Sequence, residues 1–211
     1  MSQTLTLHSL PLFPLSTVLF PDGTLDLRVF EVRYLDMVRK CRDAGAPFGV
    51  VALAEGSEVR RAGAPEERLH EVGTLATLLQ LQAPQAGLLA LRCRGTQRFR
   101  MLRTRRLPHG LWVADVRLLP ADVAVAIPPD LQPAARALEA LLTSLRERAG
   151  AEGTPPAPDP ARLDDCGWVA NRWCELLPLP LELKQRLMAL DNPLLRLELV
   201  DDVLERTGIG R

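Results

Sequence analysis

The spacing of hydrophobic residues changes along the first part of the chain, and each change predicts a different element. Over residues 25–29, leucine and valine alternate with polar residues, which is the period of a half-buried strand. Between Val32 and Cys41 apolar residues recur every three positions, and the segment ends near Gly45, so we expect a short helix with a glycine stop. The compact apolar run at residues 48–53 predicts a central strand, and the polar stretch 55–68 predicts a loop.

Strand patterns follow one another from residue 70 onward. The segments 72–82 and 88–94 flank a five-residue connection, Ala-Pro-Gln-Ala-Gly, and predict a hairpin. Two further strands are expected at 97–105, after a break at Gly95-Thr96, and at 111–119, after a Pro-His-Gly break. Several short strands with one helix favour an α+β fold built on a small, mostly antiparallel barrel or folded sheet.

Helical patterns replace strand patterns after Pro120. Residues 133–148 carry leucines at helical spacing, and residues 150–160 contain four prolines and predict a linker. A second helix is expected after a cap at Asp164 or Asp165, a third at 183–190, and a fourth from Asn192-Pro193, a cap followed by proline. We therefore expect two parts, residues 1–120 and a helical subdomain at 121–211.

The apolar run at residues 10–20 raises the question of a membrane or export segment. It is eleven residues long and contains Pro11 and Pro14, whereas a spanning helix needs about 20 apolar residues. No basic residue precedes it, which argues against a secretory signal. Leu12 and Phe13 cannot point the same way in a strand, so we expect this segment either to be buried on both faces or to wrap irregularly around the barrel because of Pro11 and Pro14. The interpretation is a cytoplasmic protein without membrane association.

Composition places the chain among folded globular proteins. Of its 211 residues 47% are hydrophobic and 25% charged, and the formal net charge is zero, so no general preference for polyanions follows. The cysteines are widely spaced, which predicts reduced thiols rather than disulfides or paired zinc ligands; they are Cys41, Cys93, Cys166 and Cys174.

Motifs for catalysis are not recognisable in the sequence. No Gly-Lys pair could build a phosphate-binding loop, and the histidines His8, His70 and His109 have no partner at metal-ligand spacing. None of the serines lies in a recognisable nucleophile setting. We therefore expect no enzyme activity, no cofactor and no metal ion.

One charged pattern has two interpretations. Four arginines share even-numbered positions while apolar residues hold odd ones; they are Arg92, Arg94, Arg98 and Arg100. Such a row on one sheet face could bind RNA phosphates or acidic peptide groups. The alternative is a solvated face that protects the sheet from aggregation, which the zero net charge favours.

Several ordered motifs resemble one family. The run "LPLFPLSTVLFPDGTLDLRVFEVRYLDMV" at residues 10–38 resembles the start of the N-terminal, substrate-recognition domain of the ATP-dependent protease Lon. The segments "FGVV", "EVGTLA" and "GTQRFR" follow in the family's order, and "LKQRLMALDNPLLRLELV" resembles its helical part. The resemblance covers nearly the whole chain.

This resemblance implies a fold, a function and a set of motif residues. The fold is a PUA-like, mostly antiparallel β pseudo-barrel followed by a small helical subdomain. The function is a freestanding, non-catalytic module that binds unfolded or exposed apolar protein segments in quality control, with a separate ATPase or protease as a further partner. An RNA-binding module using the arginine face is the alternative. Scaffold roles are expected for the motif residues Phe30, Glu31, Arg33, Tyr34, Gly95 and Phe99, and the alternative for the residues of the opening run is direct contact with ligand peptides.

We expected Phe30 and Tyr34 to share one face of the predicted helix, because they are four positions apart. Glu31 would lie at the positive end of that helix, and Arg33 would pair with a loop carboxylate.

Overall fold

The computed structural model describes residues 5–58, 67–149 and 162–209. The chain divides into two compact units. The first unit contains Met1–Ala121 and Pro180–Ala189, and the second contains Asp122–Leu179 and Leu190–Arg211. The predicted division after residue 120 and the predicted linker at 150–160 stay predictions, and the linker lies outside the described residues.

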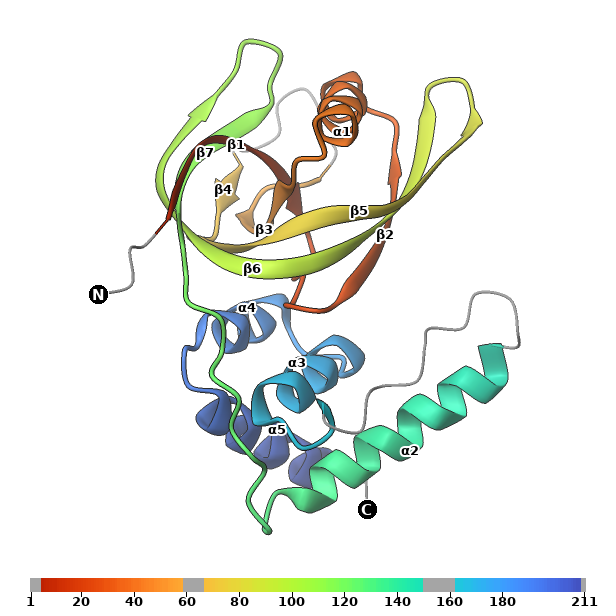
Figure 1. Ribbon diagram of the computed structural model, residues 1–211, viewed down its shortest axis with the longest axis vertical. Helices are drawn as coiled ribbons and strands as arrows, with labels where there is room; N and C mark the ends of the chain where they lie inside the picture. Colours follow the sequence, from red (N-terminus) through yellow and green to blue (C-terminus); the bar gives the residue numbers. More distant parts are fainter. Residues whose placement is uncertain (1–4, 59–66, 150–161, 210–211) are drawn as a thin grey trace. The chain divides into compact units, whose positions relative to one another are not determined.

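The first unit is a closed ring of strands (Figure 1). Neighbouring strands pair in the order β1-β7-β6-β5-β3, and a parallel pairing of β3 with β1 closes the ring. The other ring pairings are antiparallel, while β2 pairs with β6 and β4 with β3. This confirms the predicted α+β pseudo-barrel. The strands are β1 Thr6–Leu15, β2 Thr24–Val29, β3 Phe48–Glu55, β4 Arg68–Leu69, β5 Val72–Gln85, β6 Leu88–Arg106 and β7 Trp112–Leu118.

The second half of strand β1, from Leu10 to Leu15, is buried on both faces, which is one of the two arrangements expected from the sequence. Leu10 and Leu12 belong to one core cluster together with Phe99. Phe13 and Leu15 belong to a second cluster on the other face. Strand β1 pairs with β7 along one edge and with β3 along the other, so both edges of its backbone have strand partners. Its two faces can therefore both carry apolar side chains.

Strand β6 differs from the prediction in two ways. Its hairpin with β5 has a two-residue connection, with Gly87 at φ 78°, because the strands continue further than the hydrophobic pattern does. The expected break at Gly95 is also wrong, since β6 runs through it. Gly95 bonds to the turn before β2 instead: its N–H donates to Gly23 O at 2.8 Å, and its carbonyl accepts from Asp22 N at 2.9 Å.

Helix α1, Val32–Ala44, follows β2 and ends at Gly45, whose φ of 59° suits a glycine stop. Leu35, Val38 and Cys41 are buried as expected, but Val32 is 71% exposed. Phe30 precedes the helix and is 55% exposed. The expectation that Phe30 and Tyr34 share a helix face is therefore wrong, because the helix begins only after Glu31.

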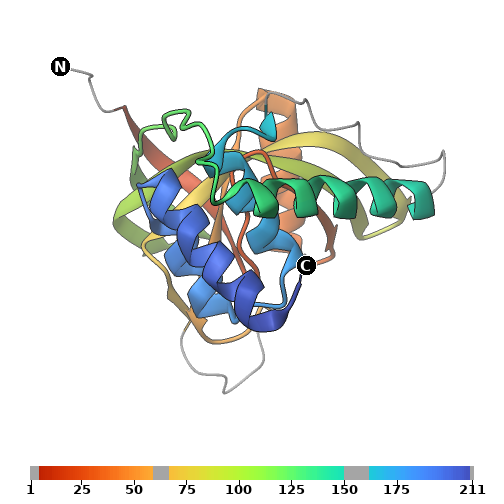
Figure 2. The same ribbon diagram turned by 90° about the horizontal axis from the view of Figure 1, so that it is seen from below.

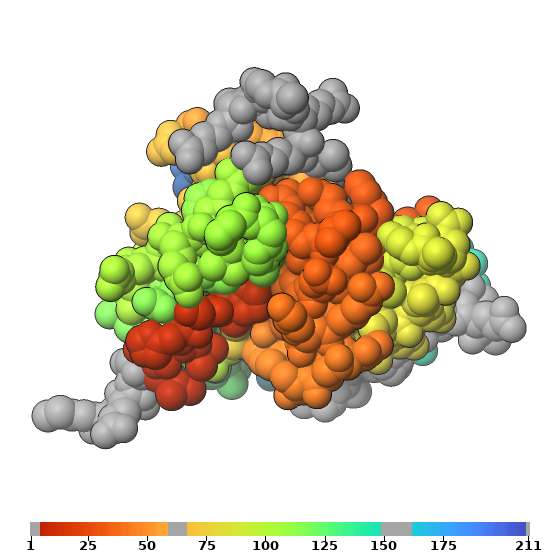
Figure 3. Space-filling model, turned by 90° about the horizontal axis from the view of Figure 1, so that it is seen from above, coloured from red at the N-terminus to blue at the C-terminus, as the bar shows by residue number. Residues whose placement is uncertain are grey.

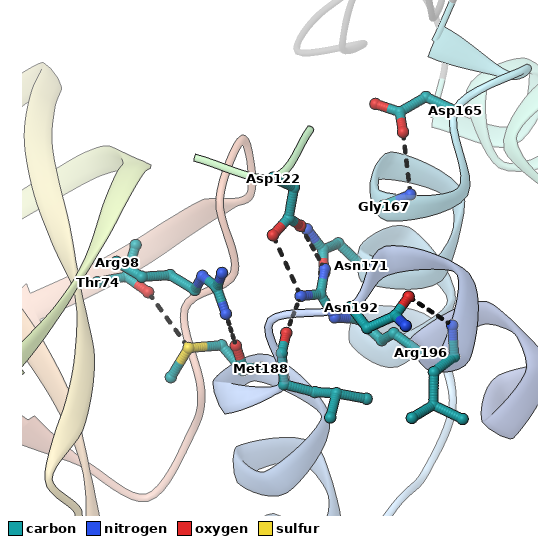
Figure 4. Close-up of polar contacts among 11 residues, drawn as sticks. Thr74, Arg98, Asp122, Asp165, Gly167, Asn171, Met188, Asn192 and Arg196 are labelled. Atoms are coloured by element: carbon teal, nitrogen blue, oxygen red, sulfur yellow. Dashed lines mark hydrogen bonds and ion pairs between the residues drawn. The ribbon is translucent and has the colours of Figure 1, made fainter. Parts of the chain in front are cut away.

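Helix α4, Leu181–Ala189, belongs to the first unit, where its side chains bond to the sheet. Gln185 Nε2 donates to the carbonyl of Val72 at 2.8 Å. The hydroxyl of Thr74 donates to Met188 Sδ at 3.8 Å, as Figure 4 shows. The sequence predicts this helix at residues 183–190 but as part of the helical subdomain at 121–211.

The second unit contains α2 Gln132–Ala149, α3 Cys166–Leu176 and α5 Pro193–Thr207. Asp165 caps α3 by accepting from Gly167 N at 3.0 Å, and Asn192 caps α5 by accepting from Leu195 N at 3.2 Å. Both caps were expected from the sequence. Figure 2 shows α5 running beside α3. Among the described residues, no helix combines the length and the apolar composition that a membrane span needs.

A buried arginine holds the second unit together. Arg196 is 1% exposed, and its guanidinium donates to Asp122 Oδ2 at 2.5 Å and to Asn171 Oδ1 at 3.1 Å. It also donates to the carbonyl of Leu190. These contacts appear in Figure 4 and give the "DNPLLRL" motif a physical role, since α5 presents Arg196 one turn after its cap.

Candidate functional site

Two adjoining hollows lie where β2 leads into α1, and we call the surface around them the Phe30 surface. The outer hollow, about 430 Å³, is lined by Phe30, Glu31, Val32, Arg33 and His109. The inner hollow, about 160 Å³, shares Phe30 and Glu31 with it. Its other lining residues are Phe13, Leu15, Asp26, Leu27, Arg28, Val29, Tyr34 and Glu58. Figure 3 views the face on which the exposed side of α1, in orange, lies.

The Phe30 surface combines exposed apolar residues and charged residues with an aromatic floor. Phe30 and Val32 are the exposed apolar residues, and the rings of Phe13 and Tyr34 stack below them at a centroid distance of 4.2 Å. Both floor residues are buried. Exposed apolar side chains beside a hollow with an aromatic floor are a common property of surfaces that bind apolar ligands.

Arg33 connects the helix start to the neighbouring loop and the aromatic floor. Its Nη2 lies 3.0 Å from Glu31 Oε2, and its Nη1 donates to the carbonyl of Gly110 at 2.9 Å. The guanidinium carbon lies 4.5 Å from the centre of the Tyr34 ring. The carboxylate partner of Arg33 is thus Glu31 at the helix start, and its loop partner is a carbonyl. These bonds hold Arg33 in place where it lines the outer hollow.

Two pKa shifts follow from this environment. Burial raises the pKa of the Tyr34 hydroxyl well above its usual value, and Tyr34 is the only tyrosine in the chain. The hydrogen bond from Arg92 lowers the pKa of Asp26, whose carboxylate lies 2.7 Å from Arg92 Nε. The site therefore presents a neutral phenol at its floor and an ionised carboxylate at its rim.

The structure separates the four arginines that the sequence placed in one row. Arg92 pairs with Asp26, Arg94 with Asp22 and Arg100 with Glu71. Arg98 is only 3% exposed, and its Nη1 donates to the carbonyl of Met188 in α4 at 3.0 Å (Figure 4).

The simple alternation of buried and exposed residues fails in this part of the sheet, where the register with β5 also shifts between Thr74 and Ala76. Arg98 and the adjacent Phe99 point to opposite faces of β6, and both are buried, Arg98 against the Met188 carbonyl of α4 and Phe99 in a core cluster. A ligand role for the arginine row stays a prediction.

Two further motif residues lie in close-packed positions. A Cβ added at Gly95 would lie 2.2 Å from the carbonyl oxygen of Phe20. The ring of Phe99 is fully buried, and its Cζ would lie 2.7 Å from a Cβ added at Gly73. Only glycine fits at these two close approaches.

Metal and thiol chemistry gain no support from the described part of the chain. Those residues contain no group of three His, Cys, Asp or Glu side chains placed to hold a metal ion. All four cysteines are buried, and burial raises the pKa of the Cys93 thiol to about 11.

Sequence reading missed the exposed pair Phe30 and Val32, because it assigned Phe30 to the helix and Val32 to its buried face. One signal was available: apolar residues stand on both sides of Glu31, directly before the predicted helix.

Three comparisons with known proteins bear on the family of the chain and on its fold. The family model described as "ATP-dependent protease La (LON) substrate-binding domain" matches residues 9–206. A solved structure of a Lon N-terminal domain protein from Xanthomonas campestris is 34% identical, with a TM-score of 0.66. The match covers 92% of this chain and 97% of that one.

The N-terminal domain of Mycobacterium avium complex Lon protease is 20% identical, with a TM-score of 0.58, and shares the fold. That match covers 92% of this chain and 96% of the other. No curated protein matches the chain.

Proposed function

The chain belongs to the family of Lon protease substrate-binding domains, and we propose that it binds exposed apolar segments of other proteins at the Phe30 surface. Phe30 carries the proposal. It is large and apolar, it is 55% exposed, and it lines both hollows. The expected partnership with a separate ATPase or protease stays a prediction.

The energetics favour an apolar ligand. Burying a whole phenylalanine side chain contributes about 1.5–3 kcal/mol, so covering the exposed half of Phe30 would contribute about 1 kcal/mol. Val32 would add a similar amount, because most of its side chain is exposed. Aromatic residues at the centre of an interface often contribute most of the binding energy.

The floor of the surface is already ordered, which lowers the cost of binding. Phe13 and Tyr34 are stacked, and Arg33 is held by Glu31 and by Gly110. A ligand would therefore need to order few side chains of the protein when it binds.

A binding titration tests this function. The probe is fluorescein-labelled α-lactalbumin, kept unfolded by reduction and carboxymethylation, and the readout is fluorescence anisotropy. We expect F30D to weaken binding about tenfold or more, because it removes apolar contact and introduces a charge to be desolvated. Folded α-lactalbumin should bind far more weakly than the unfolded form.

The matched control is L102D, since Leu102 is 50% exposed in β6 and lines neither hollow. This variant should bind the unfolded probe within about twofold of the wild type. Equal retention of unfolded and folded probe, or equal losses in F30D and L102D, would contradict the proposal.

A further inference from the structure

Strand β2 has one edge that no described strand pairs with. Its six residues pair with β6, from Thr24 opposite Arg94 to Val29 opposite Leu89. The other strands of the ring follow a different path, and β2 lies off it. We call the side of β2 away from β6 its outer edge.

The outer edge offers hydrogen-bonding groups in a regular row. In an antiparallel pair, alternate residues direct their N–H and C=O groups to the partner, and the remaining residues direct theirs away from it. The outward groups of β2 therefore repeat at the spacing that an extended chain can match.

An apolar wall accompanies this edge. Residues Asp26 to Val29 of β2 line the inner hollow, and Phe13 and Leu15 of β1 line the same hollow. Phe13 and Leu15 are two positions apart on one strand, so they lie on the same face. A segment placed along β2 would thus have backbone partners on one side and apolar side chains in reach.

We propose that the bound segment adds to the outer edge of β2 as an extra strand, with every second side chain directed into the inner hollow over Phe13 and Tyr34. This inference rests on the proposed function and specifies its ligand as an extended chain with alternating apolar residues. Strand addition combines backbone affinity with side-chain selection in this way.

One carboxylate of the inner hollow, that of Glu58, offers a place for a basic residue of the same segment. The inner hollow is lined by three carboxylates, those of Asp26, Glu31 and Glu58, and by one guanidinium, that of Arg28. Asp26 is paired with Arg92 and Glu31 with Arg33, whereas Glu58 accepts from the backbone N–H of Ser16. A lysine beside the apolar residues of the ligand would complement the Glu58 carboxylate.

Asp26 and Arg28 also explain how the outer edge of β2 can stay free of a second copy of the chain. Both side chains are exposed and charged, and charged residues on an edge strand oppose pairing with a second copy of the same chain. Two β2 strands side by side would bring like charges together in some registers. A foreign chain of alternating apolar and neutral residues meets no such repulsion.

Backbone methylation tests the inference. The probe is a labelled ten-residue peptide in which valine and leucine alternate with threonine, with a lysine at each end. Two further peptides keep all side chains but carry N-methyl groups either on the valine and leucine amides or on the threonine amides. Only one set of amides can face β2, so one methylated peptide should bind at least tenfold more weakly and the other within about threefold.

The outcomes separate this inference from the proposed function. If neither the unmodified peptide nor unfolded α-lactalbumin binds, the proposed function fails. If both bind but the two methylated peptides behave alike, the function stands and strand addition is overturned. Free protein that sediments as a dimer with the outward-directed β2 amides protected from exchange would also overturn it, because a second copy would then occupy the edge.

Discussion

Replacing Arg98 by methionine separates the structural role of this arginine from the ligand role that its sequence position suggested. Arg98 is buried in β6, and its guanidinium bonds to the carbonyl of Met188 near the end of α4. Methionine keeps much of the apolar stem of arginine but cannot donate this hydrogen bond. The substitution should therefore loosen α4 from the sheet.

The expected cost follows from the hydrogen bond. A bond from a charged donor contributes about 1.5–3 kcal/mol, and the carbonyl of Met188 would lose that donor in a buried place. A loss of about 2 kcal/mol corresponds to about a thirtyfold change in an opening equilibrium. R92M is the matched control: Arg92 pairs with Asp26 on the surface, where such a pair contributes about 0.2–1 kcal/mol.

Native-state hydrogen exchange measures this change directly. In R98M the amides of α4 should exchange about thirtyfold faster than in the wild type, while in R92M they should change less than about fivefold. Unchanged exchange in α4, together with weaker binding of RNA or of an acidic peptide, would refute the structural role. It would support the ligand role predicted from the arginine row.

Three further predictions concern stability. The pKa of Tyr34 is raised by burial, so the folded chain favours the neutral phenol. The contribution of Tyr34 to the free energy of unfolding should be fully present below about pH 10 and should fall by about 1.4 kcal/mol per pH unit above it. Tyrosinate absorbance at 295 nm should appear only on unfolding. R196M should lower the free energy of unfolding in urea by about 3 kcal/mol, since it leaves the carboxylate of Asp122 without its guanidinium partner. Adding D122N to R196M should restore part of the lost stability, and no restoration would argue against the ion pair. G95A should lower the free energy of unfolding by about 2 kcal/mol or more, because its Cβ would meet the Phe20 carbonyl. G87A lies in open space at positive φ and should lower it by about 1 kcal/mol. Similar losses for the two variants would contradict the close packing at Gly95.

Local chemistry explains what the sequence predicted correctly. The caps at Asp165 and Asn192 and the stop at Gly45 depend on residues within one helical turn, so their sequence signals suffice. The burial of β1 on both faces followed from its adjacent apolar residues. The resemblance to the Lon domain then supplied the ring-shaped sheet, which local patterns alone left open.

Contacts distant in sequence explain what was missed. Arg98 alternates with apolar residues like a surface arginine, but the carbonyl of Met188, ninety positions away in α4, makes its site a buried one. Gly95 was read as a strand break, whereas it is the close approach between β6 and the turn after Phe20. Neither partner is visible in the neighbouring sequence.

Hydrogen exchange of the protein with and without unfolded α-lactalbumin tests the central claim most directly, because it locates the bound chain without any substitution. The account predicts slower exchange of amides between residues 24 and 33, which span β2 and the start of α1, and little change around Leu102 in β6. Binding that leaves residues 24–33 unchanged, or that protects another part of the sheet instead, would contradict the account.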